Sequence, residues 1–189
     1  HGQAVMEGHA QVQEALDTFA ASEHPGELSD MLLSPIREIA RTGIVCYKWS
    51  SLCFVLVHRL RDVLRDSPPP GEGEVASYQQ GVGTWDEACM SVCSLLEGLD
   101  GPPFTIQRLC ELLVKPQQHH RSRLKLLSAV DKLVSVTTLS PSYTPEEASV
   151  LLQQAEKRVA EERAAAEQVL RRRREQQQLQ LDQQASIEG

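Results

Sequence analysis

The sequence is poor in aromatic side chains and has no long apolar run. Phe, Trp and Tyr make up 4% of its 189 residues, although 41% of all residues are hydrophobic. A buried core must therefore consist mainly of Leu, Val, Ile and Ala, which suits helix packing better than a β-sandwich. The longest apolar run, Leu52 to Val57, is far shorter than the roughly 20 residues of a membrane-spanning helix. These absences predict an all-α protein with no membrane span.

The sequence also lacks the motifs of common enzyme classes. It has no GxSxG, no HExxH and no P-loop, so nothing supplies a partner that would make His58 a catalytic base. His58 is expected to be a partly exposed structural residue. Cys89 and Cys93 could be combined with His119 and His120 in a zinc site, but there is no CxxC or HxxxH pair. We therefore expect no enzyme, no metal site and no cofactor.

Net charge and cysteine content indicate which partners and which cellular compartment to expect. The net charge of −7 argues against non-specific binding to nucleic-acid backbones. The five cysteines are odd in number and lie in apolar or helical surroundings, which favours reduced, buried thiols in the cytosol or nucleus. The chain starts with His1-Gly2-Gln3 and shows neither an initiator Met nor a signal-peptide pattern. We expect a fragment of a protein that is not secreted.

Apolar periodicity and helix-terminal signals predict a compact bundle of about six helices over residues 1–143. Gly43 is expected to end the second helix in a left-handed conformation, and Pro35 to split or kink it. Thr84 and Glu87 have the spacing of a capping box. Residues 67–83, with three prolines and four glycines, are predicted to be a loop. The expected helices are 9–21, 28–42, 50–66, 84–96, 105–115 and 118–136, although Val134 to Leu139 could instead be extended.

Residues 144–189 are predicted to form a long C-terminal helix. Thr144 and Glu147 form a second capping box with proline at the first helical position, and nothing breaks the helix before about Gln184. A thin apolar seam at alternating spacings of four and three residues runs from Ala148 to Val169. Such a seam allows a coiled-coil or cytoskeletal partner. The block Arg171–Arg174 is either a solvated helix end or a functional basic site. Such a site could bind RNA, the acidic surface of tubulin or another acidic partner, or act in nuclear import.

The stretch from Gly101 to Leu113, GPPFTIQRLCELL, carries the clearest local signal. Thr105 is expected to be the N-cap of a helix, with its hydroxyl accepting from the first turn. Phe104 and Leu109 have the spacing of a hydrophobic staple. One helix face is apolar, made of Ile106, Leu109, Leu112 and Leu113, whereas the polar positions are Gln107, Arg108 and Glu111.

This stretch resembles the core motif of the regulatory subunit 2 family of serine/threonine protein phosphatase 4, with Pro102 as a departure. Ile39 to Gly43, followed by Trp49-Ser50, resembles a further segment of the family. Phe54 to Asp66 and the proline-bearing Ser67 to Pro70 resemble the parts that follow. The likeness covers roughly residues 10 to 140.

The resemblance implies a non-catalytic protein. Members of the family bind the phosphatase 4 catalytic subunit and a further regulatory subunit, and they act in the nucleus and at centrosomes. The resemblance therefore implies a phosphatase-regulatory domain over residues 1–143, with the metals in the catalytic partner and a location in the cytoplasm and nucleus. The family usually ends in a long acidic, disordered tail, whereas residues 144–189 favour a helix. The alternative is a structural adaptor that docks into a large cytoskeletal or coiled-coil assembly through this helix.

Candidate partner-binding residues follow from both arguments. Trp49 and Trp85 either anchor loops on the core or serve as interface anchors, since interface hot spots favour Trp, Tyr and Arg. The remaining candidates lie on the motif helix and in the basic block: Phe104, Gln107, Arg108, Glu111, Arg171, Arg172, Arg173 and Arg174.

Overall fold

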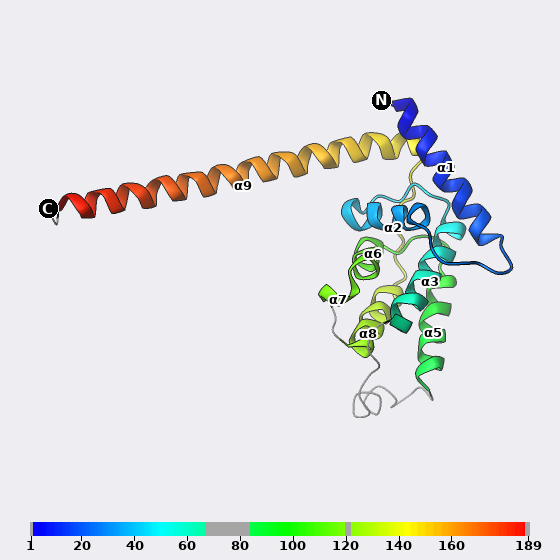
Figure 1. The fold of residues 1–189 in the computed structure, drawn as a ribbon. Helices are drawn as coiled ribbons and strands as arrows, with labels where there is room; N and C mark the ends of the chain where they lie inside the picture. The colour runs from blue at the N-terminus through cyan, green and yellow to red at the C-terminus, as the bar shows by residue number, and fades with distance from the viewer. Residues whose placement is uncertain (1, 67–83, 120–121, 188–189) are drawn as a thin grey trace. The chain divides into compact units, whose positions relative to one another are not determined.

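A computed structural model describes residues 2–66, 84–119 and 122–187 of the chain. The described residues form eight α-helices, which confirms the all-α prediction (Figure 1). They divide into two compact units, His1–Ser149 and Val150–Gly189. Among the described helices, none combines the length and the apolar character that crossing a membrane requires.

The first unit contains seven described helices and the first turn of an eighth. The predicted loop 67–83 lies outside the described residues. The helices are α1 (Gly2–Ala20), α2 (Asp30–Thr42), α3 (Trp49–Asp66), α5 (Trp85–Glu97), α6 (Ile106–Val114), α7 (Pro116–His119), α8 (Arg123–Val134) and α9 (Pro145–Ile187), which continues into the second unit.

Helix α3 lies at the centre of the first unit and contacts α1, α2, α5, α6 and α8 (Figure 1). Its sequence explains this position, because its apolar residues are not confined to one stripe. Cys53 and Val57 are buried on further sides of the helix. The predicted inward residues are all buried: Leu52, Val55, Leu56, Leu60, Val63 and Leu64.

Helix α2 runs through Pro35 without a break, so the predicted split is wrong. Proline has no amide hydrogen and leaves the carbonyl four residues earlier without its usual partner. Here the hydroxyl of Ser34 donates to that carbonyl, on Met31, at 2.8 Å. Gly43 ends the helix at φ 72° and donates its N–H to the Ile39 carbonyl, which confirms the predicted left-handed terminator.

The predicted sixth helix is two helices. Pro116 begins α7 instead of only stopping α6, because a proline fits the first turn, where its missing N–H costs nothing. The inward face of α8 also differs from the prediction. Leu126 is buried, whereas Leu124 and Leu133 are half-buried.

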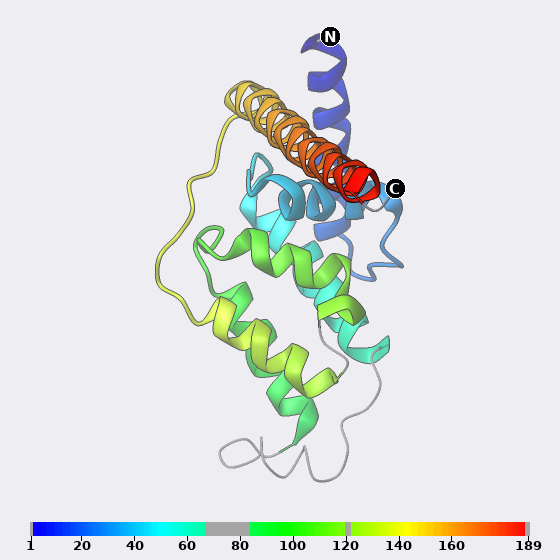
Figure 2. The ribbon, with the colours of Figure 1, turned by 90° about the vertical axis from the view of Figure 1, so that its left-hand side faces the viewer.

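The segment after α8 is extended and joins distant parts of the first unit. Thr138 accepts from the amide of Phe104 at 3.0 Å, and the amide of Ser140 donates to Pro102 at 2.6 Å. Farther along, Val45 pairs with Ser142 in an isolated parallel bridge. The segment runs along one side of the helices to the start of α9 (Figure 2). It holds the approach to α6 in place.

The capping box at Thr144 is confirmed. Its amide donates to the Glu147 carboxylate at 2.9 Å, and its hydroxyl accepts from the Glu147 amide at 3.3 Å. Ala148 is buried. In the second unit the predicted seam is open, since Leu152 and Ala155 are half-buried and most described side chains beyond them are exposed.

Candidate functional site

The motif helix α6 is held by its apolar face. Ile106, Leu109, Leu112 and Leu113 are buried, as predicted. Full burial of such side chains contributes about 1.5–3 kcal/mol each. The polar residues of the same helix are thereby kept at the surface, where they are available to a partner.

Thr105 does not cap α6 with its side chain. Its backbone lies at φ −84°, ψ 5°, outside the extended region that a capping hydroxyl needs in order to reach the first-turn amides. Its hydroxyl donates instead to the Leu133 carbonyl in the last turn of α8, at 2.6 Å. Thr105, which was predicted to be the N-cap of α6, therefore joins the start of α6 to the end of α8.

Phe104 is 58% exposed, which does not fit a closed hydrophobic staple on the fully buried Leu109. Its ring stands at the surface while its backbone is fixed by the Thr138 carbonyl on one side and by Thr105 on the other. A large apolar side chain on a rigid backbone loses little conformational entropy when a partner covers it. Phe104 is therefore suited to partner binding.

The polar candidates on α6 differ in their surroundings. Arg108 and Glu111 form an ion pair at 2.6 Å, with side chains 48% and 35% exposed. The Gln107 amide donates to the Ala40 carbonyl at 3.4 Å, and its side chain lies against Gly43, where an added Cβ would meet Gln107 Oε1 at 3.0 Å. Gln107 therefore joins α6 to the end of α2, whereas Arg108 and Glu111 contribute surface charge.

Both tryptophans are half-buried and make internal contacts. Trp49 Nε1 donates to the Leu99 carbonyl at 2.7 Å. The Arg123 guanidinium lies 5.9 Å from the centre of the Trp85 ring, within the range of a cation–π interaction. Trp49 is the first residue of α3, and Trp85 is the first residue of α5. Their role in partner binding stays a prediction.

Arg171–Arg174 lie in the second unit, on α9, with exposed side chains. Arg171 pairs with Glu175 one helical turn later, at 3.0 Å. Such exposed pairs contribute little to stability, about 0.3–0.5 kcal/mol. The charges of the block are therefore presented to solvent.

The cysteines are free thiols, and four of the five are buried. Burial raises the pKa of Cys53 to about 12, with a further contribution from Glu97. Burial, followed by Cys93 and Asp86, raises the pKa of the half-buried Cys89 to about 11. Among the side chains that the structure describes, no three His, Cys, Asp or Glu residues are grouped to hold a metal ion.

The structure also brings together a cluster of four side chains that the sequence does not reveal, because its members come from three separate segments. His9 of α1 stacks on Tyr47, with ring centres 4.2 Å apart, and its Nε2 lies 2.9 Å from the Cys46 sulfur. The Tyr47 hydroxyl donates to Glu38 at 3.5 Å. Burial, followed by the charge of Glu38, raises the pKa of Cys46 to about 12. Such a thiol is not a nucleophile near neutral pH. The contacts of His9 with Cys46 and Tyr47 join α1 to the segment before α3.

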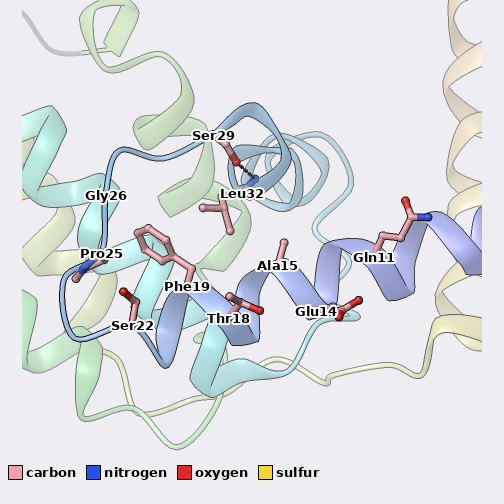
Figure 3. A pocket seen from close by; sticks show the side chains of 10 residues that line it. All are labelled: Gln11, Glu14, Ala15, Thr18, Phe19, Ser22, Pro25, Gly26, Ser29 and Leu32. Atoms are coloured by element: carbon pink, nitrogen blue, oxygen red, sulfur yellow. Dashed lines mark hydrogen bonds between the residues drawn. The ribbon is translucent and has the colours of Figure 1, made fainter.

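A groove between α1 and the start of α2 also went unnoticed (Figure 3). It has a volume of about 530 Å³. A signal was present, since residues 1–36 contain no Lys or Arg, but the walls come together only in the fold. They consist of Gln11, Glu14, Ala15, Thr18, Phe19, Ser22, Pro25, Gly26, Ser29 and Leu32.

A neighbouring cavity of about 570 Å³ is lined by charged side chains of α3. Opposite charges compensate each other there, as in the 2.7 Å pair between Arg65 and Asp62. His58 lines this cavity and meets the Phe19 ring edge-on at 5.3 Å. It is half-buried, as predicted for a structural histidine.

Comparison with known proteins covers most of the chain. The PPP4R2 family model matches residues 12–185. Serine/threonine-protein phosphatase 4 regulatory subunit 2 of Drosophila melanogaster is 32% identical over 145 residues, which cover 72% of this chain and 23% of that protein. The Homo sapiens protein of the same name is 31% identical over 130 residues, covering 67% and 31%. The chain thus spans about a quarter to a third of the length of these relatives, and no solved structure matches it.

The motif resemblance in the sequence covers residues up to about 140, but the range matched by the family model extends further and includes most of α9. The C-terminal helix therefore lies inside the family match and not outside it. With 12–185 of 189 residues matched, the chain belongs to the PPP4R2 family, the family of serine/threonine-protein phosphatase 4 regulatory subunit 2.

Proposed function

We propose that this chain is part of a non-catalytic regulatory subunit that binds a protein phosphatase 4-type catalytic subunit together with a further regulatory subunit. The observation that carries the proposal is the family match over residues 12–185. The relatives are named as regulatory subunits of that phosphatase. The partnership implies action in the cytoplasm and nucleus, including centrosomes.

The surface at the start of α6 is the binding site we assign to the catalytic subunit. It combines the exposed ring of Phe104 with the charged pair of Arg108 and Glu111. Aromatic and Arg side chains dominate the binding energy of protein interfaces. The hydrogen bonds of Thr105 and Phe104 to the residues at and after the end of α8 hold this surface in one conformation, which lowers the entropic cost of binding.

The test measures binding of the purified chain to purified phosphatase 4 catalytic subunit by surface plasmon resonance. Phe104→Ala should weaken binding at least about tenfold, as expected for a hot-spot residue. Met90→Ala is the matched control, because Met90 on α5 is equally exposed, at 59%. Circular dichroism establishes that both variants are folded.

The two parts of the proposal fail separately. If the wild-type chain does not bind the catalytic subunit at micromolar concentration, alone or with the further regulatory subunit present, the proposed function is wrong. If the wild type binds and Phe104→Ala binds equally well, the function stands and the assigned surface is wrong.

The exposed side chains of α9 favour a second candidate, a structural adaptor that docks through this helix into a cytoskeletal or coiled-coil assembly. Deletion of residues 150–189 leaves the first unit complete. A tagged chain with this deletion should lose its place in the assembly in cell fractionation. Unchanged fractionation would exclude the adaptor role.

A further inference from the structure

The groove between α1 and α2 has an apolar floor and a polar rim. Phe19 and Leu32, both buried to more than nine-tenths, form the floor together with Ala15 and Pro25. Figure 3 shows the Phe19 and Leu32 side chains between the two helices, with Glu14 along α1. A volume of about 530 Å³ lies within the usual range of ligand sites, about 300–1,000 Å³. The floor can therefore receive a large apolar side chain.

The walls are fixed before any partner arrives. The Ser29 hydroxyl accepts from the Leu32 amide at 3.4 Å and begins α2. At the other side, the amides of Ala21 and Ser22 donate to Asp17 and Phe19 and close the end of α1. A preformed site binds without paying for its own ordering.

Among the residues that line the groove, Glu14 is the one with a charged side chain. Residues 7–36 contain Glu7, Glu14, Asp17, Glu23, Glu27 and Asp30 and no Lys or Arg. Asp17 accepts hydrogen bonds from Gln13 and Ser51, and Asp30 pairs with Arg37 at 2.7 Å. Glu14 lines the groove, is exposed and makes no hydrogen bond or ion pair to another residue that the structure describes. Its carboxylate is therefore available to a cation from outside.

These observations identify the occupant by its chemistry. We propose that the groove binds a short segment of another protein in which one large apolar side chain is flanked by Lys or Arg. The apolar side chain would rest on Phe19 and Leu32, and a basic side chain would pair with Glu14. The proposal is independent of the proposed phosphatase function.

The same charges disfavour other occupants. A nucleic acid or an acidic peptide would bring negative charge against Glu14 and its acidic neighbours, which opposes binding. A symmetric dimer would place the same surface of a second copy on this one. Since residues 7–36 offer no Lys or Arg, that pairing would join two acidic surfaces.

The test uses short fluorescent peptides and the full chain in anisotropy titrations. The first peptide has a central leucine between lysines; in the second a serine replaces the leucine, and in the third glutamates replace the lysines. The first should bind at least about tenfold more tightly than the others, as one buried apolar side chain and one partly buried ion pair allow. Its affinity should fall with added salt.

Variants locate the peptide on the chain. Glu14→Lys should weaken the leucine–lysine peptide at least about tenfold. Glu167→Lys is the matched control, since this exposed residue of α9 changes the charge equally and is no part of the groove. Circular dichroism verifies that both variants are folded.

Three outcomes would overturn the proposal. One is no binding of the leucine–lysine peptide up to millimolar concentration. Another is an equal loss of affinity in Glu14→Lys and Glu167→Lys. The third is a concentration-dependent dimer in analytical ultracentrifugation that Glu14→Lys abolishes, because it would assign the groove to a second copy of the chain.

Discussion

Gly43→Ala tests how the end of α2 and the motif helix α6 depend on each other. Gly43 has φ 72°, a conformation in which an L-residue loses roughly 1–2 kcal/mol because Cβ crowds the backbone. A Cβ here would also stand 3.0 Å from Gln107 Oε1. The Gln107 side chain is flexible and can move away, but it then gives up its 3.4 Å hydrogen bond to the Ala40 carbonyl.

The two costs set the magnitude. The long hydrogen bond contributes at most about 0.5 kcal/mol, at the low end for neutral groups. Gly43→Ala should therefore lower the free energy of unfolding by about 1–2.5 kcal/mol. With a urea dependence of about 2 kcal/mol/M, the midpoint should fall by roughly 1 M.

Equilibrium urea unfolding followed by tryptophan fluorescence measures this change. Trp49 and Trp85 both lie in the first unit, so the signal reports the unit that contains Gly43. Gly8→Ala is the matched control: Gly8 lies within α1, and an added Cβ meets nothing within 4 Å. Gly8→Ala should leave the midpoint unchanged or raise it, by up to about 1 kcal/mol in stability.

The double variant separates the two costs. In a Gln107→Ala background the contact is gone, so Gly43→Ala should lose about 0.5 kcal/mol less than in the wild type. A midpoint for Gly43→Ala equal to that of the wild type would refute the argument from the left-handed backbone. A double-variant cycle without coupling would refute the contact with Gln107.

Three further predictions concern other parts of the chain. Thr144→Ala removes the capping box of α9, which should cost about 1 kcal/mol and make the Glu147 amide exchange its hydrogen severalfold faster in NMR; an unchanged rate would contradict the cap. Burial lowers the pKa of His9 against the smaller opposing effect of Glu146. As the pH falls below about 6.5, the unfolded chain therefore takes up this proton first, and the stabilising contribution of neutral His9 is lost. The wild type should lose more stability than His9→Gln between about pH 7 and 5 in urea titrations; equal losses would contradict the assignment. In native maleimide labelling read by mass spectrometry, the half-buried Cys89 should react before Cys110, whose pKa burial raises much further; early labelling of Cys110 would contradict the packing of α6.

The parts of the fold that were predictable from sequence depend on neighbours a few residues away. The capping boxes at Thr84 and Thr144 join residues three positions apart, and Gly43 ends α2 through a bond to Ile39. The buried face of α6 follows from helical periodicity alone. Both partners of each such interaction lie within a few residues of each other, so a short stretch of sequence is enough to predict it.

The wrong predictions concern residues whose actual hydrogen-bond partners or surroundings the local sequence pattern did not indicate. Thr105 has the sequence context of an N-cap, but its hydroxyl bonds to Leu133, 28 residues later. A staple was expected for Phe104, but its backbone pairs with Thr138 and its ring stays exposed. At Pro35 the sequence could not show that the Ser34 hydroxyl would donate a hydrogen bond to the Met31 carbonyl, which the proline leaves without its usual amide partner.

The candidate site was predictable in part. The motif picked out the α6 surface, whose role in binding stays a prediction. The groove beside α1 was not predicted, because its floor joins Phe19 and Leu32 from two helices. The absence of Lys and Arg before Arg37 could have marked the region as acidic, but it could not have revealed the apolar floor.

The bridge between Val45 and Ser142 has a consequence for synthesis of the protein. Val45 is fully buried in the folded chain, yet its pairing partner emerges from the ribosome roughly a hundred residues later, and closing so long a loop carries an entropic cost. Helices α1 to α3 can form while this partner is still missing. The core around Val45 is therefore incomplete until the segment that contains Ser142 has been synthesised.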